Sequence, residues 1–335
     1  MKAGLWLADG YCGVLIAIAG DLDYLAKTIG LPRWSSNSPC SLCRCTKEGP
    51  STYFDNRLGV AGWLSDIWTS QEWRAWPGRT HCSLFSMIHL SACNIALDWM
   101  HAKYLGADQY IYGSIMYYLC YVFMPGAPIE NLQIIWRFMQ AYYKRHRIRN
   151  RYRQMCKLTM FKRKKDYPKL RGKAVEVKAF GPVLQAFWTT HVSNTSLTHK
   201  RITLLLKKNI ELDDIIDQNP TRNGNFTIPQ PHASRFKTTA FQVAQLHKQL
   251  NEHFKDIDIK IFNVTSKTHS LMHIALLAEH LHPGLTWCYQ GEDYMRIVQR
   301  LLQSCVRGNS PTGSVIKATN HYNLGMSMSF KDDFI

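Results

Sequence analysis

The sequence predicts an α/β fold: a small sheet near the N-terminus, followed by a long and mostly helical insertion. The apolar, β-prone run 14–19 ends at Gly20-Asp21, which is typical of a buried strand that places an acid at its carboxyl end. A second run, 90–97, ends in the same way at Asp98. Helical hydrophobic patterns then dominate the chain, so the strands come early and the helices follow.

We expect one interrupted domain with three parts. Residues 1–109 form a partial α/β core with a cysteine-rich, loop-rich module, 110–265 form the helical insertion, and 266–335 return to the core. The segments with helical patterns are 24–29, 110–121, 129–143, 183–191, 197–217, 238–254, 268–280 and 293–305. Proline and Asn/Gly turns make 220–234 the longest predicted loop.

Composition favours a folded protein with a polyanionic partner. Of the 335 residues, 46% are apolar and 12% aromatic, which is enough for a large core and excludes a disordered tail. The formal charge of +17 makes nucleic acid the first candidate partner. Ten scattered cysteines fit a metal site in a reducing compartment better than a disulfide framework.

Neither apolar stretch of the sequence predicts an export signal or a membrane span. Asp9 interrupts the N-terminal apolar run, which disfavours a secretory signal peptide. The apolar stretch 110–124 is rich in tyrosine and shorter than the ~20 residues a spanning helix needs, so a buried core helix is expected there.

Most of the excess charge lies in one segment. Between Lys144 and Lys178 there are 15 Lys or Arg residues against two acids. Cations interleaved with aromatic residues are typical of contacts to a nucleic-acid backbone. The candidate DNA-binding residues are Lys144, Arg145, Arg147, Arg149, Arg151, Arg153, Lys162, Arg163, Lys164 and Lys165. A nuclear-localisation signal and a merely solvated face are the alternative interpretations.

Two short motifs far apart in the chain could share one metal ion. Cys40-x-x-Cys43 offers two thiolates, and His269-x-x-x-His273 presents two imidazoles on one helix face. Together they complete a Cys₂His₂ zinc site, whereas each histidine alone is more simply a packed or solvated residue. A structural zinc contributes on the order of 10–16 kcal/mol of apparent binding free energy, enough to hold the two segments together.

Acidic residues flank both halves of this predicted zinc site. Asp21 follows a predicted strand, and Glu292 lies in the first turn of a predicted helix. In many enzymes that cleave phosphodiesters, two acids hold the divalent metal ions that catalyse the reaction. The alternatives are a helix N-cap for Asp21 and an ordinary first-turn acid for Glu292. Asp98 could orient the imidazole of His101 or join the acidic site. The alternative is that Asp98 caps the following helix and forms a buried pair with His101.

The order of these motifs resembles the catalytic core of cut-and-paste DDE transposases, most closely the CACTA (En/Spm-like) group, which is related to the V(D)J recombinase catalytic subunit. The resemblance spans residues 13 to about 308 and rests on Asp21-x₁₈-Cys40-x₂-Cys43, on Asp98-x-Met100-His101-x₃-Leu105-Gly106 and on His269-x₃-His273-x₁₈-Glu292. It implies a ribonuclease-H-like core that carries three acids, with the insertion before the last one. It also implies that Asp21 and Glu292 are the second and third catalytic acids.

The same resemblance implies structural Zn²⁺, catalytic Mg²⁺ or Mn²⁺, a DNA partner and a nuclear location, with a homodimer as a candidate assembly. It implies neither a membrane nor a small-molecule substrate. The first acid of the family has no clear counterpart, since only Asp9 precedes Asp21. We therefore expect an N-terminally truncated sheet and a degenerate activity, with a non-catalytic, zinc-stabilised DNA/RNA-binding or interaction protein as the alternative function.

Overall fold

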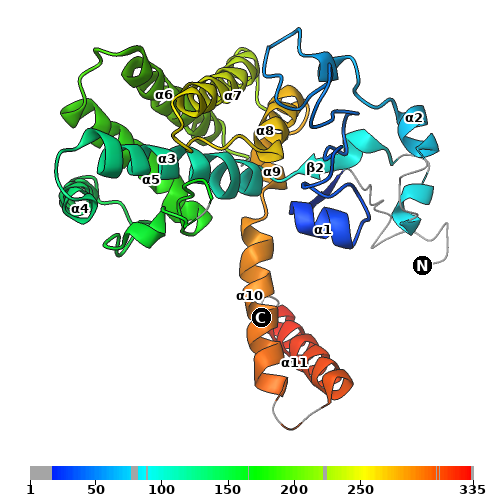
Figure 1. The fold of residues 1–335 in the computed structure, drawn as a ribbon. Helices are drawn as coiled ribbons and strands as arrows, with labels where there is room; N and C mark the ends of the chain where they lie inside the picture. Colours follow the sequence, from blue (N-terminus) through cyan, green and yellow to red (C-terminus); the bar gives the residue numbers. More distant parts are fainter. Residues whose placement is uncertain are drawn as a thin grey trace. The chain divides into compact units, whose positions relative to one another are not determined.

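A computed structural model describes the chain from residue 17 to residue 332, apart from residues 77–81, 88–89, 165, 222–224, 307 and 309. The described part is mostly helical (Figure 1). The chain divides into two compact units, Met1–Trp287 and Cys288–Ile335, which are described separately here.

Two short parallel strands form the sheet of the first unit. Strand β1 (Ile18–Gly20) pairs with β2 (Ile95–Leu97), and Gly20 lies opposite Leu97. Because parallel strands end at the same edge, the acids that follow them, Asp21 and Asp98, come from adjacent positions. Both predicted strands are present but shorter than predicted: residues 14–16 lie outside the described part, and residues 92–94 form a 3₁₀ turn before β2. The larger ribonuclease-H-like sheet is not shown among the described residues.

Between the strands lies a cysteine module, residues 40–76, preceded by helix α1 (Leu22–Lys27) and ending with helix α2 (Ser70–Ala75). It is loop-rich, as the sequence predicts, and it folds around Trp63 and Trp73, both fully buried. The Asn56 side-chain amide donates a hydrogen bond to the Ala244 carbonyl at 2.8 Å. Trp63 stacks on Phe241 with ring centroids 6.1 Å apart, so the module packs on a distant helix.

After β2 a π-helical turn, η5 (Met100–Ala107), leads into a helical body formed by five helices. These are α3 (Asp108–Tyr118), α4 (Pro128–Arg145), α5 (Ala174–His191), α6 (Leu197–Gln218) and α7 (His232–Asp256). Helix α6 packs along α7 (Figure 1). Helix α8 (Ser266–Leu277) then contacts α7, η5 and β2, which places it between the helical body and the cysteine module (Figure 1).

Helix α5 begins at Ala174, nine residues before the predicted start at Val183. The prediction was wrong there because Gly181-Pro182 is read as a helix breaker. In the structure Gly181 lies against α3, where an added Cβ would come within 2.5 Å of the Tyr112 hydroxyl. The glycine therefore permits close helix packing instead of ending the helix. Helix α7 likewise begins at His232, earlier than the predicted 238.

The second unit consists of helix α10 (Tyr289–Val306) packed against helix α11 (Pro311–Asp332). The first unit ends with a single helical turn, α9 (Pro283–Thr286). Among the described residues, each helix is too short or too polar to cross a bilayer.

Candidate metal centre and acidic pocket

Backbone hydrogen bonds shape the loop that carries three cysteines. The backbone of Cys43 pairs with that of Ile67 in an antiparallel β-bridge. On one side of this bridge the Arg44 N–H donates a hydrogen bond to the Asp66 carbonyl at 2.9 Å. On the other side the Trp68 N–H bonds to Leu42 O at 3.0 Å. The pairing fixes the loop, so that Cys40, Cys43 and Cys45 are all buried side by side.

Helix α8 supplies the histidines from the other end of the unit. His269 and His273 are four residues apart and therefore share one face of the helix. The Cys43 Sγ lies 3.3 Å from Nε2 of each histidine, and the two Nε2 atoms are 3.1 Å apart. The two predicted halves thus meet, across 226 residues of sequence.

Cys45 joins this cluster although the sequence analysis did not assign it as a ligand. Donor atoms of Cys40, Cys43, Cys45 and His269 all lie within 4.8 Å of one another. The available signal was the spacing Cys43-x-Cys45, which keeps the third thiol in the same tight loop. His273 is not one of these four, but its Nε2 lies 3.3 Å from Cys43 Sγ and 3.1 Å from His269 Nε2. A tetrahedral ion takes four ligands. Cys45 and His273 are therefore rival candidates for the fourth position.

Aromatic packing holds the imidazoles in place. The Trp63 ring lies edge-on to His269 at 4.5 Å and tilted to His273 at 4.7 Å between centroids. Trp63 is itself fixed by a hydrogen bond from its Nε1 to the Asp55 carbonyl at 2.7 Å. Nδ1 of His269 has no hydrogen-bond partner among the described residues, so packing orients this ring.

The electrostatics of the cluster favour a thiolate at Cys40 and disfavour one at Cys43. Burial opposes the thiolate of Cys40, but hydrogen bonds from Cys43 and Cys45, with help from the histidines, bring its pKa well below the ordinary value. The hydrogen bond to Cys40 and burial in turn raise the pKa of Cys43 far above its usual range. Cys40, Cys43, Cys45 and His269 form a buried Cys₃His set, a donor combination that structural zinc sites use. The residues therefore fit a structural metal ion.

The acids at the strand ends have local roles as well. Asp21 caps helix α1, since its Oδ1 accepts the Tyr24 N–H at 2.5 Å. Asp98 is buried, accepts the Met100 N–H at 2.8 Å and forms a short contact with Nδ1 of His101. Both alternative interpretations, the N-cap and the buried pair, are thus confirmed as contacts.

Asp21 and His101 nevertheless line one pocket, together with Lys169 and Lys267, which we call the acidic pocket. Its volume is about 290 Å³, and it opens at the edge where both strands end. Ligands of α/β sheets bind at this edge, outside the carboxyl ends of parallel strands.

Lys267 contacts the end of the motif that runs from Asp98 to Gly106. Its Nζ donates to the Leu105 carbonyl at 2.9 Å, and a Cβ on Gly106 would come within 2.9 Å of the Lys267 side chain. Gly106 is therefore needed for α8 to pack closely on η5. Burial first, and then the charge of Lys169, lower the pKa of Lys267 to about 8, although Asp98 and Asp21 oppose the shift.

Other predicted site residues are not brought into these sites. Glu292 lies on α10 in the second unit, and its side chain is outside the described part, so a meeting with Asp21 stays a prediction. Asp9 and Lys165 are also outside the described residues. The remaining predicted DNA-binding residues are all exposed. Lys162 packs separately, its Nζ lying 4.6 Å from the centre of the Tyr121 ring.

None of the family models, curated proteins or solved structures compared with the chain matches it.

Proposed function

We propose that this chain is a zinc-stapled, DNA-processing protein of the DDE transposase lineage. The observation that carries the proposal is the contact of Cys43 with His269 and His273, at 3.3 Å each. The resemblance requires this contact, and ordinary helix packing gives no reason for two histidines to meet three cysteines in a buried space. The two-strand parallel sheet, with an acid after each strand, also supports the proposal.

In this proposal the acidic pocket is where a phosphodiester is cleaved. A divalent ion bound there would activate the attacking water and stabilise the leaving oxygen. Asp21 supplies a carboxylate from the pocket wall, and the buried Asp98 holds the His101 imidazole, which lines the same pocket. Lys267 and Lys169 line the same pocket as Asp21 and offer positive charge to a phosphate. Glu292 is the third acid that the resemblance implies.

A non-catalytic, zinc-stabilised nucleic-acid-binding protein is the second candidate. It is favoured by the hydrogen bonds that both acids already make, Asp21 to the Tyr24 N–H and Asp98 to the Met100 N–H. A carboxylate that serves as a cap or a buried pair needs no metal.

Nicking of supercoiled plasmid in Mg²⁺ or Mn²⁺ separates the two functions. Asp21→Asn keeps the cap, because asparagine caps helices as well as aspartate does, but it removes the charge. If Asp21 holds a metal, we expect nicking to fall by about 100-fold, since metal stabilisation of a transition state is worth several kcal/mol.

The matched control is Glu252→Gln, which removes an exposed carboxylate that pairs with Lys248 in helix α7 and does not line the pocket. It should leave nicking unchanged. If purified protein has no metal-dependent nicking, or if both variants nick like the parent, the catalytic proposal fails and the binding protein stands.

A further inference from the structure

A second pocket lies apart from the metal centre, between α4 and the segment that follows it. Its volume is about 600 Å³, in the range of small-molecule sites, and we call it the arginine pocket. Helix α4 lines it with Trp136, Gln140, Tyr143 and Lys144. These positions are spaced by four, three and one residues, so they share one helix face.

The facing wall is the chain segment 149–153. Arg149, Arg151 and Arg153 are alternate residues, all exposed and all lining the pocket. Tyr152 lies between them, is buried, and donates a hydrogen bond from its hydroxyl to the Arg171 carbonyl at 2.7 Å. The arginine-bearing segment is therefore anchored to the body of the protein, which limits the entropy lost when the arginines bind a ligand.

Four cations and no acid are among the described residues that line this pocket. The charge of Glu176 reaches the two tyrosines of the pocket, but its carboxylate accepts the Lys173 N–H at 2.8 Å and caps α5. The arginines and Lys144 therefore repel one another without a compensating acid in the pocket. An anionic ligand would relieve that repulsion.

Aromatic side chains give the pocket a second kind of contact. Trp136 is half-buried on the wall that faces the arginines. Tyr143 is only 1% exposed; the Tyr152 N–H lies near its hydroxyl oxygen, but the hydroxyl proton has no acceptor among the described residues. Burial raises the pKa of Tyr143, so the hydroxyl keeps its proton and can donate it to an acceptor in the pocket. A buried donor without a partner is costly unless a ligand supplies an acceptor oxygen.

We propose that the arginine pocket binds one nucleotide unit, with the base stacked on Trp136 and the phosphate held by the arginines and the Tyr143 hydroxyl. Arginine forks match phosphate oxygens, and aromatic rings stack on any base. A single strand of DNA or RNA and a free nucleotide both offer this chemistry; the choice of a strand rests on the proposed function.

Fluorescence anisotropy with a labelled 12-nucleotide single strand tests the pocket in the full chain, without added Mg²⁺ or Mn²⁺. Trp136→Ala should weaken binding about tenfold, because stacking on an aromatic ring is worth roughly that factor per base. The effect should vanish on an abasic strand of equal length. Arg151→Gln with Arg153→Gln should flatten the salt dependence by about 1.4 log units per log unit of salt.

Two control variants match these changes. Ile134→Ala truncates an exposed apolar residue of the same helix, and Lys200→Gln with Lys207→Gln removes two exposed charges from α6. Trp136→Phe keeps an aromatic face and should retain most of the affinity, which excludes a folding defect. Competition with a mononucleotide shows which ligand the pocket binds. If micromolar mononucleotide displaces the labelled strand, and does so only when Trp136 is present, the ligand is a free nucleotide. If the mononucleotide does not displace the strand, the ligand is the strand.

The proposal is overturned if Trp136→Ala binds like Ile134→Ala, or if the arginine and lysine pairs change the salt dependence equally. Either result would leave an ordinary phosphate-binding surface. The anisotropy assay does not measure cleavage, so a protein that fails to nick plasmid can still pass this test. The two proposals can therefore fail separately.

Discussion

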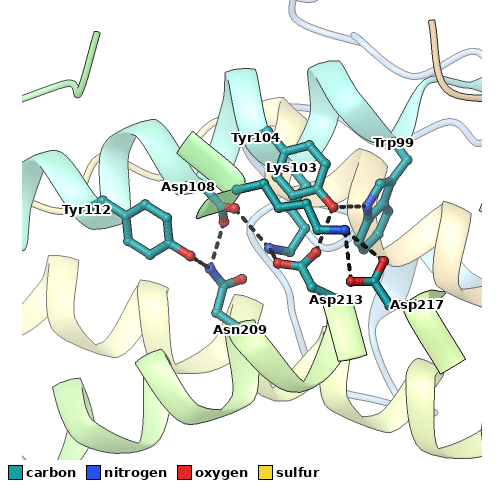
Figure 2. A network of polar contacts seen from close by, with 9 residues as sticks. Trp99, Lys103, Tyr104, Asp108, Tyr112, Asn209, Asp213 and Asp217 are labelled. Atoms are coloured by element: carbon teal, nitrogen blue, oxygen red, sulfur yellow. Dashed lines mark hydrogen bonds and ion pairs between the residues drawn. The ribbon is translucent and has the colours of Figure 1, made fainter. Parts of the chain in front are cut away.

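The metal centre and a buried ion network in the helical body both hold together segments that are distant in the sequence, but they use different interactions. Both join segments more than 100 residues apart, since Lys103 contacts Asp213 across 110 residues and Cys43 contacts His269 across 226. Figure 2 shows the network: Lys103 Nζ lies 2.8 Å from Asp108 Oδ2 and 3.0 Å from Asp213 Oδ2.

The network satisfies its own charges. The Tyr104 hydroxyl donates to Asp213 at 2.7 Å, and the Asn209 amide donates to Asp108 at 2.7 Å (Figure 2). Burial raises the pKa of Asp108 to about 6 even though Lys103 opposes the shift. The metal centre instead gathers thiols and an imidazole, a donor set able to hold a metal ion. The network thus joins its segments through protein groups alone, whereas we propose that an ion joins the cysteine module to α8.

Loss of the metal should have the largest effect. His269→Ala should abolish bound zinc and destabilise the fold by on the order of 10 kcal/mol, because metal binding free energy is folding free energy at such sites. Elemental analysis and thermal melting with and without a chelator measure both quantities. Cys156→Ala, which removes an exposed thiol, is the control. Unchanged zinc content in His269→Ala would remove the metal staple from the proposal.

The same measurement on Cys45→Ala and His273→Ala separates the two rival ligands. The variant that loses zinc identifies the fourth position. In the Co²⁺-substituted protein, the intensity of the thiolate charge-transfer band distinguishes three cysteine ligands from two.

The ion network should give the next largest effect. Lys103→Met leaves two buried carboxylates without their cation, and breaking a buried pair in this way costs about 3–5 kcal/mol. Urea unfolding measures the loss. Lys178→Met is the matched control, because Lys178 pairs with Asp217 at 2.7 Å at the surface, where such pairs contribute about 0–1 kcal/mol. Equal losses in both variants would show that the network is no stronger than a surface pair.

A buried histidine outside both clusters should give a smaller effect that depends on pH. Burial lowers the pKa of His247 on α7 to about 3 from 6.5, so the folded protein holds it neutral. This stability is fully present above pH 6.5 and is lost as the pH falls toward 3. At pH 4 the loss is about 3 kcal/mol.

His247→Leu should therefore unfold at a lower pH than the parent, measured by urea unfolding from pH 7 to pH 4. Asp108, whose raised pKa acts in the opposite direction between pH 3.8 and about 6, is present in both proteins and does not change the difference between them. Parallel curves for the two proteins would mean that His247 does not control the acid limb.

Local pattern and spacing in the sequence predicted much of this protein. The two strands and the helical majority follow from short-range patterns. The meeting of Cys43 with His269 and His273 was predicted because each half of the site supplies the two ligands that the other lacks. Short-range patterns left the motif from Asp98 to Gly106 without a role, since its partner, Lys267, comes from helix α8.

Only the tertiary structure showed that Cys45 joins the cluster, that Arg149, Arg151 and Arg153 face Trp136, and that Lys103 is fully buried between two acids. A lysine or an aspartate in a helical sequence looks like a surface residue until another helix covers it. Burial and pairing are set by contacts between distant segments, and those contacts have no period or spacing along the chain.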